Sequence, residues 1–288
     1  MQYRRFGKTG FDISAVSYGG IVSMDDGQSN SDRYVSWAID QGINYFDVAP
    51  SYGDAEEKLG NSLRPYRNRV HLACKTAERL RASAEKELSQ SMKLLHTDHF
   101  DVYQLHAISS MDDVEKAFGP GGVMEMVRKM KEEGVAAHVG ITAHNEDAAL
   151  TCLELYDFDT VLFPFNWFMH MEHGMGSRLI QAAKARDMGV LCMKSLIERS
   201  WNSEDERQNG AFPKSWCKPI DVEDEAFGTA AMKYALSLGV DTLIPPGNYA
   251  SFSFAVNHIE ECLLHPLSDG DRRFLEEKLK LVRGKEFF

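Results

Sequence analysis

Four ionisable side chains stand at or near the ends of three successive buried segments of the sequence. Asp47 ends the apolar run of "INYFDVAPSYG" and Tyr52 lies in the turn behind it, while Lys75 comes near the end of "VHLACKT" and His106 ends "DVYQLH". If these segments are parallel strands, their carboxyl ends meet at one rim of a sheet or barrel. We therefore expect the four side chains to converge.

These four residue types together suit proton transfer to a carbonyl oxygen. A phenol titrates near pH 10, but an opposite charge within about 4–6 Å lowers its pKa by roughly 1–3 units, and Lys75 is the candidate for that charge beside Tyr52. Asp47 would keep a buried Lys75 protonated, and His106 would donate a hydrogen bond to the substrate oxygen. Such a set protonates an oxygen that gains negative charge as hydride reaches the carbonyl carbon.

Each residue also has an ordinary structural explanation. An aspartate at a strand end is most often a turn or helix cap, a loop tyrosine usually packs on the surface, and a histidine is more often hydrogen-bonded structure than a catalyst. Their occurrence at three consecutive strand ends favours the catalytic interpretation.

Length and composition predict a large core and a small-molecule ligand. The chain has 288 residues, 43% of them hydrophobic, and a net charge of −11, so one domain over residues 1–288 is expected and binding to nucleic acid is not. No apolar stretch approaches the roughly 18 residues of a membrane span, and "MQYRRFGKTG" carries no signal-peptide pattern. We expect a cytoplasmic protein that does not bind membranes. The sequence leaves its oligomeric state open.

The cysteines predict neither a disulfide framework nor a metal site. There are five of them, an odd number, far apart and without a C-x-x-C pair, which is typical of reduced core thiols. The histidines of "HMEH", His170 and His173, lack the spacing of H-E-x-x-H, so a pocket-lining loop is favoured over metal binding there. No metal is predicted.

Short apolar segments alternate with amphipathic helical segments along almost the whole chain. We count eight candidate strands, each continuous and apolar as doubly covered parallel strands are: Ala15–Gly19, Ile43–Ala49, Val70–Lys75, Val102–His106, Ala137–Thr142, Thr160–Asn166, Gly189–Ser195 and Thr242–Pro246. The helical segments between them include Asp32–Gln41, Ser83–Leu95, Val123–Glu133 and Ser177–Met188. This predicts an α/β fold, a (β/α)8 TIM barrel, whose units average roughly 31 residues.

Three segments lie outside this repeat. "YRRFGKTGFDIS", residues 3–14, predicts a β-hairpin that caps one end of the barrel, and "SDGDRRFLEEKLKLV", residues 268–282, predicts a C-terminal external helix. Residues 196–221 contain Trp201, Trp216 and many charges. We interpret this long loop as a lid over the barrel mouth, with disorder as the alternative.

In several motifs the chain resembles the aldo-keto reductase superfamily of nicotinamide-dependent barrel enzymes. The motifs are "RRFGKTG", "NYFDVAPSYGDAEEKLG", "LACKT", "DVYQLH", "KEEGVAAHVGIT" and "LIPPGN", in the order and spacing of that family. The resemblance implies a catalytic tetrad of Asp47, Tyr52, Lys75 and His106, with Tyr52 as general acid or base. Hydride would pass between C4 of the nicotinamide and the carbonyl carbon.

The resemblance also implies a set of cofactor contacts across the barrel mouth: Gly20, Ile21, Asp47, Thr142, Leu162, Met193, Lys194, Leu196, Gly247, Asn248 and Asn257. Several of these depart from the family pattern. Thr142-Ala143 stands where relatives have Ser-Asn, Leu162 replaces a glutamine, and Met193 replaces an aromatic residue. Gly247, Asn248 and Ser253 stand where many relatives carry Lys, Ser and Arg. We expect NADP(H), with NAD(H) as the alternative, since an added phosphate prefers charged donors.

A small carbonyl or alcohol is the expected substrate. Tyr18, Trp167 and Phe168, together with Trp201 or Trp216, are candidates for an apolar substrate wall, and ordinary loop packing is their other explanation. Two further functions remain open. In the first, the protein is a barrel aldolase whose Schiff-base nucleophile is Lys75, which would have to be a neutral amine. In the second, it is a nicotinamide-binding sensor or partner subunit with little turnover.

Overall fold

The computed structural model describes residues 1–282 and contains the predicted barrel. Residues 283–288, the last of the predicted domain, lie outside the described part. Eight parallel strands form one sheet in the order β12-β9-β8-β7-β6-β5-β4-β3. They are β3 (Tyr18–Gly19), β4 (Tyr45–Asp47), β5 (His71–Thr76), β6 (Phe100–Ile108), β7 (Ala136–Ala143), β8 (Thr160–Phe163), β9 (Gly189–Met193) and β12 (Thr242–Ile244). A parallel bridge between Val16 and Leu243 joins the two ends of the sheet, so the (β/α)8 TIM-barrel prediction is confirmed.

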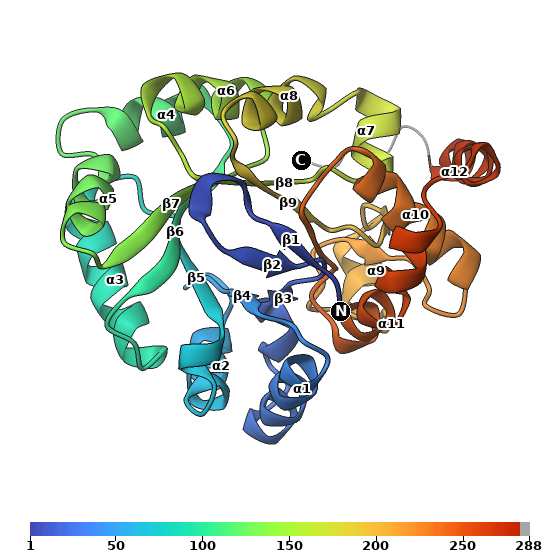
Figure 1. Cartoon of the computed structure of the whole chain (residues 1–288), viewed down its shortest axis with the longest axis horizontal. Coiled ribbons are helices and arrows are strands. Elements are labelled where there is room, and N and C mark those ends of the chain that lie inside the picture. Colours follow the sequence, from blue (N-terminus) through green and yellow to red (C-terminus); the bar gives the residue numbers. More distant parts are fainter. Residues whose placement is uncertain (283–288) are drawn as a thin grey trace.

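Helices surround these strands (Figure 1). They are α1 (Gln28–Asp40), α2 (Ala55–Leu63), α3 (Arg81–Leu94), α4 (Met111–Phe118), α5 (Val123–Glu132), α6 (Glu146–Leu155), α7 (Trp167–His173), α8 (Ser177–Ala185), α10 (Glu225–Ser237) and α11 (Tyr249–Leu264). Residues 1–282 also contain three short 3-10 helices: η1 (Gly7–Thr9) near the N-terminus, η2 (Gly20–Ser23) after β3, and η3 (Arg67–Arg69) before β5.

The alternation of side chains along each strand decides what points into the barrel. On β6, Tyr103 and Leu105 join the large core between strands and helices, whereas Val102 joins a separate cluster inside the barrel. Successive side chains of a strand point to opposite faces, so Gln104 and His106 share the inward face with Val102. This pattern lets one strand bury apolar residues outside and hold polar residues inside.

The predicted strands are present with ends that shift by a few residues. The largest shifts of a single end are three residues: β3 begins at Tyr18 rather than Ala15, and β8 stops at Phe163 rather than Asn166. Asn166 instead begins α7, because its side chain accepts a hydrogen bond from the amide of Met169.

The predicted N-terminal hairpin is an antiparallel pair of β1 (Tyr3–Arg5) and β2 (Asp12–Ser14). The segment between the two strands contacts residues at the starts of barrel strands. The ring of Phe11 stacks on His71 with centroids 3.8 Å apart, and a Cβ on Gly189 would meet the ring of Phe6 at 2.5 Å. The hairpin therefore packs at the end of the barrel opposite the carboxyl ends of the strands.

Residues 196–221 are folded and contain β10 (Ile197–Arg199), α9 (Glu204–Gln208) and β11 (Lys218–Pro219), with β10 and β11 antiparallel. Trp201 donates its indole hydrogen to the carbonyl of Ser215 at 2.9 Å. Lys214 donates to the carbonyls of Val22 and Met24 at 2.9 and 2.8 Å. This segment is thus tied both to itself and to the loop after β3.

The predicted C-terminal helix is α12 (Asp269–Val282). Its first turn is fixed by Ser268 and Asp271, because each side chain accepts a hydrogen bond from the backbone amide of the other. Leu275 and Leu279 are buried, and Lys278 pairs with Asp224, the N-cap of α10, at 2.7 Å. The helix packs against α10 and α7.

Two negative findings apply to residues 1–282. None of the helices there combines the length and the apolar character needed to cross a membrane. Over the same residues, no three side chains of His, Cys, Asp or Glu come together as metal ligands would.

Candidate active site

A cavity of about 80 Å³ lies at the carboxyl ends of the barrel strands. Every strand of the barrel contributes one residue to its wall: Gly19, Asp47, Lys75, His106, Thr142, Leu162, Met193 and Ile244. The loops that follow the strands add the rest of the wall, including Tyr52, His144, Lys194 and Trp216. All four residues of the predicted tetrad therefore face one space.

The centre of the site is a chain of polar contacts from Gln104 through Asp47 and Lys75 to Tyr52. One carboxylate oxygen of Asp47 binds the ammonium of Lys75, and the other accepts from the side-chain amide of Gln104 at 2.7 Å. The ammonium also donates to the hydroxyl of Tyr52 at 3.3 Å and to the carbonyl of Val48 at 3.4 Å. The position of the phenol oxygen is thus linked to a buried ion pair.

The ion pair keeps Lys75 charged although its side chain is completely buried. Burial alone would lower the pKa of Lys75, but the carboxylate of Asp47 and the contacts with Tyr52 outweigh it, so the pKa is raised above its ordinary value. Both the contact and this direction agree with the role predicted for Asp47.

The expected effect on Tyr52 is only partly correct. Lys75 does lower the pKa of Tyr52, but burial of the phenol raises it by more, and the pKa lies above its ordinary value. The prediction of a pKa below the ordinary value is wrong, because the sequence indicated a cationic neighbour but not how completely the barrel encloses the ring. Tyr52 is therefore a protonated phenol at neutral pH.

His106 is a neutral imidazole whose ring contacts that of Tyr52. The two rings meet edge to face with centroids 5.7 Å apart. Burial, together with the charges of Lys75, His144 and Arg79, holds the pKa of His106 well below its ordinary value. A neutral imidazole donates one hydrogen bond, which is the role predicted for it toward a carbonyl oxygen.

The predicted cofactor contacts separate into two groups. Ile21, Asp47, Thr142, Leu162, Met193, Lys194 and Gly247 line the same cavity as the tetrad. Gly20 and Leu196 are buried beside it without lining it, and Asn257 is exposed on α11. Asn248 is the N-cap of α11 and lines a second cavity.

That second cavity has a volume of about 580 Å³ and adjoins the first, because Gly247 lines one and Asn248 the other. Its wall combines Tyr34 and Tyr249, whose rings stack 4.1 Å apart, with the cations Arg207 and Lys214. Asp25 and Asp26 also line it, and Asp26 pairs with Lys214 at 2.9 Å.

The residues predicted for a substrate wall lie elsewhere. Tyr18, Trp167 and Phe168 are completely buried, and none of them lines the tetrad cavity. Tyr18 bonds to Ser23, and Trp167 donates to the carbonyl of Ile197 in a core between α7 and α10. Trp216 does line the cavity, with its ring 5.8 Å from that of Tyr52. Farther out, His170 of "HMEH" bonds to Tyr234 at 2.8 Å.

Sequence reasoning missed several residues of the site. Six of them line the cavity: Gly19, His144, Cys217, Ile244, Pro245 and Pro246. A seventh, Gln104, binds Asp47 without lining it. Gln104 lies two positions before His106 on one strand, so period-two alternation places both on the inner face and could have found it. His144 follows Thr142 just beyond the end of β7, and nothing in its spacing marks it.

Comparison with known proteins finds relatives with similar sequences and folds. The chain is 23% identical over 306 residues to the uncharacterized oxidoreductase YqkF of Bacillus subtilis, covering 99% of this chain and 96% of that protein. It is 26% identical over 215 residues to the aldo-keto reductase YhdN of the same organism, covering 68% and 62%. The holo form of the aldo-keto reductase AKR11C1 from Bacillus halodurans superposes with a TM-score of 0.72 at 19% identity over 96% of both chains.

The family assignment rests on more than individual relatives. The model of the aldo/keto reductase family matches residues 20–242, which run from the loop after β3 to the start of β12 and include the whole tetrad. The chain therefore belongs to the aldo/keto reductase family of oxidoreductases.

Proposed function

We propose that the protein reduces a small carbonyl compound, or oxidises the matching alcohol, with a nicotinamide cofactor and with Tyr52 as the general acid or base. One observation carries this proposal: the ammonium of Lys75 binds Asp47 and also donates a hydrogen bond to the hydroxyl of Tyr52. Tyr52 and His106 line the same cavity.

The four residues divide the chemistry between them. A bound nicotinamide supplies or accepts the hydride. The imidazole of His106 donates a hydrogen bond to the carbonyl oxygen and holds it near Tyr52, whose hydroxyl proton moves to that oxygen as its negative charge develops. Lys75 then stabilises the phenolate that remains, and Asp47 keeps Lys75 charged. In the direction of oxidation the same phenolate takes the proton from the alcohol.

The two adjoining cavities suit an extended ligand with an aromatic amide at one end. Thr142, which carries a hydroxyl, and Lys194, which carries an amine, line the first cavity. A Cβ on Gly247 would meet the side chain of Ile21 at 2.2 Å, so this part of the wall has no room for a larger residue at position 247. The stacked tyrosines, Arg207 and Lys214 of the second cavity suit a base and its phosphates. We propose NADP(H) as the cofactor, with NAD(H) as the alternative.

We further propose that residues 196–221 act as a lid within a single barrel domain. The tetrad cavity, at about 80 Å³, is smaller than the roughly 300–1,000 Å³ of typical ligand pockets. Trp216 and Cys217 of this segment line it. Movement of the segment would enlarge the cavity and admit the cofactor.

The alternatives have less support. A Schiff-base aldolase needs Lys75 as a neutral amine, and the contact with Asp47 raises the pKa of Lys75 instead; trapping with borohydride would detect such an enzyme. A sensor with little turnover remains compatible with Leu162 and Met193 in the cavity wall, and would bind the cofactor without reducing any member of a carbonyl panel.

Replacing Tyr52 by Phe should lower kcat by about 10²–10⁴ with para-nitrobenzaldehyde or glyceraldehyde, because the ring stays and the proton donor is lost. Cofactor affinity, measured by quenching of tryptophan fluorescence, should change little. A variant that keeps at least half of the native kcat on both aldehydes would rule out Tyr52 as the acid.

The rate of reduction should be nearly independent of pH between about pH 7 and pH 10, the ordinary pKa of tyrosine. Tyr52 acts as a protonated phenol, and because its pKa is raised above the ordinary value it stays protonated throughout this range. His106 is neutral throughout the range, because its pKa lies well below the ordinary value for histidine. Reduction should therefore fall only above this window, whereas oxidation of an alcohol should speed up toward alkaline pH. A fall in the reduction rate between pH 7 and 9, measured under saturating cofactor, would contradict these directions.

Calorimetric titration should find NADPH bound more tightly than NADH, and Lys214→Met should weaken NADPH binding by about tenfold or more while changing NADH binding less, because only NADPH carries the additional phosphate. Lys129→Met, at an exposed position on α5, is the matched control. Equal affinities would favour NAD(H), and a protein that binds neither nucleotide would not be a nicotinamide-dependent reductase.

A further inference from the structure

The strand that carries His106 is irregular just after that residue. Leu105 of β6 pairs with Ile141 of β7, but the next pair joins Ile108 to Ala143, so three steps on β6 oppose two on β7. This is a β-bulge. The amide of Ala107 turns away from the regular ladder and donates to the side-chain hydroxyl oxygen of Thr142 at 2.7 Å.

The bulge forces Ala107 into an unfavourable backbone conformation. Its φ of +53° lies in the left-handed region, where the Cβ of an L-residue crowds the following carbonyl. Such a conformation persists only when surrounding contacts enforce it. The contacts that do so here also fix the peptide that carries the imidazole of His106.

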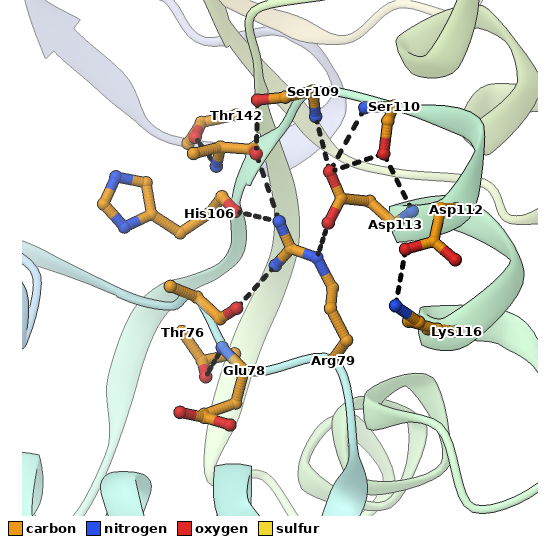
Figure 2. A network of polar contacts seen from close by, with 12 residues as sticks. Thr76, Glu78, Arg79, His106, Ser109, Ser110, Asp112, Asp113, Lys116 and Thr142 are labelled. Carbon is orange, nitrogen blue, oxygen red and sulfur yellow. Dashed lines mark hydrogen bonds and ion pairs between the residues drawn. The ribbon is translucent and has the colours of Figure 1, made fainter.

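One guanidinium supplies two of these contacts, and the hydroxyl of Ser109 adds another by donating to the carbonyl of Ala107 at 2.9 Å. Arg79, in the loop between β5 and α3, donates from Nη2 to the carbonyls of His106 and Ala107 at 2.9 and 3.1 Å, and from Nη1 to the carbonyl of Ala77 at 2.9 Å. Figure 2 shows the imidazole of His106 pointing away from this guanidinium, which reaches the backbone of His106 and not its ring. Arg79 thus joins the carboxyl ends of β5 and β6.

Asp113 holds the guanidinium in place. Its Oδ1 accepts from Nε of Arg79 at 2.8 Å, and its Oδ2 accepts from the amides of Ser109 and Ser110 at 2.9 and 3.1 Å (Figure 2). Asp113 and Ser110 also form the capping box that begins α4. The start of a helix outside the barrel is therefore connected through Arg79 to the residue that faces the cavity.

We propose that Arg79 is a positioning residue for His106: by binding the two carbonyls of the bulge, it sets the direction in which the imidazole enters the cavity. The proposal rests on the function proposed above, in which His106 orients the carbonyl oxygen of the substrate. Lysine at position 79 would keep the positive charge but not the planar fork that binds several acceptors at once. The contact geometry, rather than the charge alone, is what the site requires.

The direct test is Arg79→Met, compared with Arg81→Met as a matched control. Arg81 begins α3, is 41% exposed and pairs with two surface carboxylates, those of Glu85 and Glu125. With para-nitrobenzaldehyde and NADPH, kcat/KM of Arg79→Met should fall by about 10- to 100-fold, as expected for a displaced orienting group. Affinity for NADPH should stay within about threefold, and Arg81→Met should match the native protein.

A double-mutant cycle with His106→Ala separates positioning from general support of the fold. If Arg79 acts through His106, adding Arg79→Met to His106→Ala should cause no more than about a twofold further loss, because the group that it positions is already gone. A further loss as large as in the native background would overturn the proposal, and so would native activity of the single variant.

Two further measurements keep the test decisive. Arg79→Lys, which keeps the charge, should also lose activity in the native background but should cause no further loss in His106→Ala. If Arg79→Met does not fold, Arg79→Lys takes its place in the cycle. Full activity of Arg79→Lys would refute the geometric role. Amide hydrogen exchange of residues 104–109 does not depend on turnover, and it should accelerate in either Arg79 variant while that of α3 stays native. Unchanged exchange of residues 104–109 would contradict the role of Arg79, whether or not the native protein reduces an aldehyde. Absence of aldehyde reduction by the native protein would reject only the reductase function.

Discussion

The buried ion pair between Asp47 and Lys75 is the constraint on which the rest of the site depends. An ammonium enclosed in a barrel loses its proton unless a counter-charge compensates for the lost water, and breaking such a pair typically costs about 3–5 kcal/mol. Both oxygens of Asp47 are used, one by Lys75 and the other by Gln104. The pair therefore fixes the charge of Lys75 and its place beside Tyr52.

The barrel makes this pair possible by bringing strand ends together. Asp47, Lys75 and His106 come from β4, β5 and β6, which are neighbours in the sheet, so side chains far apart in the sequence meet within one cavity. Apolar packing between strands and helices leaves the inner face free for polar residues near the mouth. Residues outside the cavity also contribute to the site. Ala107, in the left-handed conformation, and the guanidinium of Arg79 contact or adjoin the backbone that holds His106.

Much of the fold and the core of the site could be predicted because the signals are local. Continuous apolar runs between helices indicate parallel strands, and the ionisable residues that end them indicate the rim. Other features depend on distances that spacing does not encode. Nothing near Arg79 indicates that its side chain reaches carbonyls 27 and 28 positions further on. The raised pKa of Tyr52 follows from enclosure by the whole barrel, and Trp167 and Phe168 follow a strand but turn into a separate core.

The protonation state of Lys75 can be measured directly. Heteronuclear NMR of lysine-labelled protein, with the resonance assigned by its absence from Lys75→Met, would follow the side-chain nitrogen of Lys75 as pH rises. The ion pair predicts an ammonium that persists to the ordinary lysine pKa of about 10.4 and beyond, and that loses its proton at lower pH in Asp47→Asn. A neutral amine in the native protein near pH 8, or an identical titration in both proteins, would contradict it.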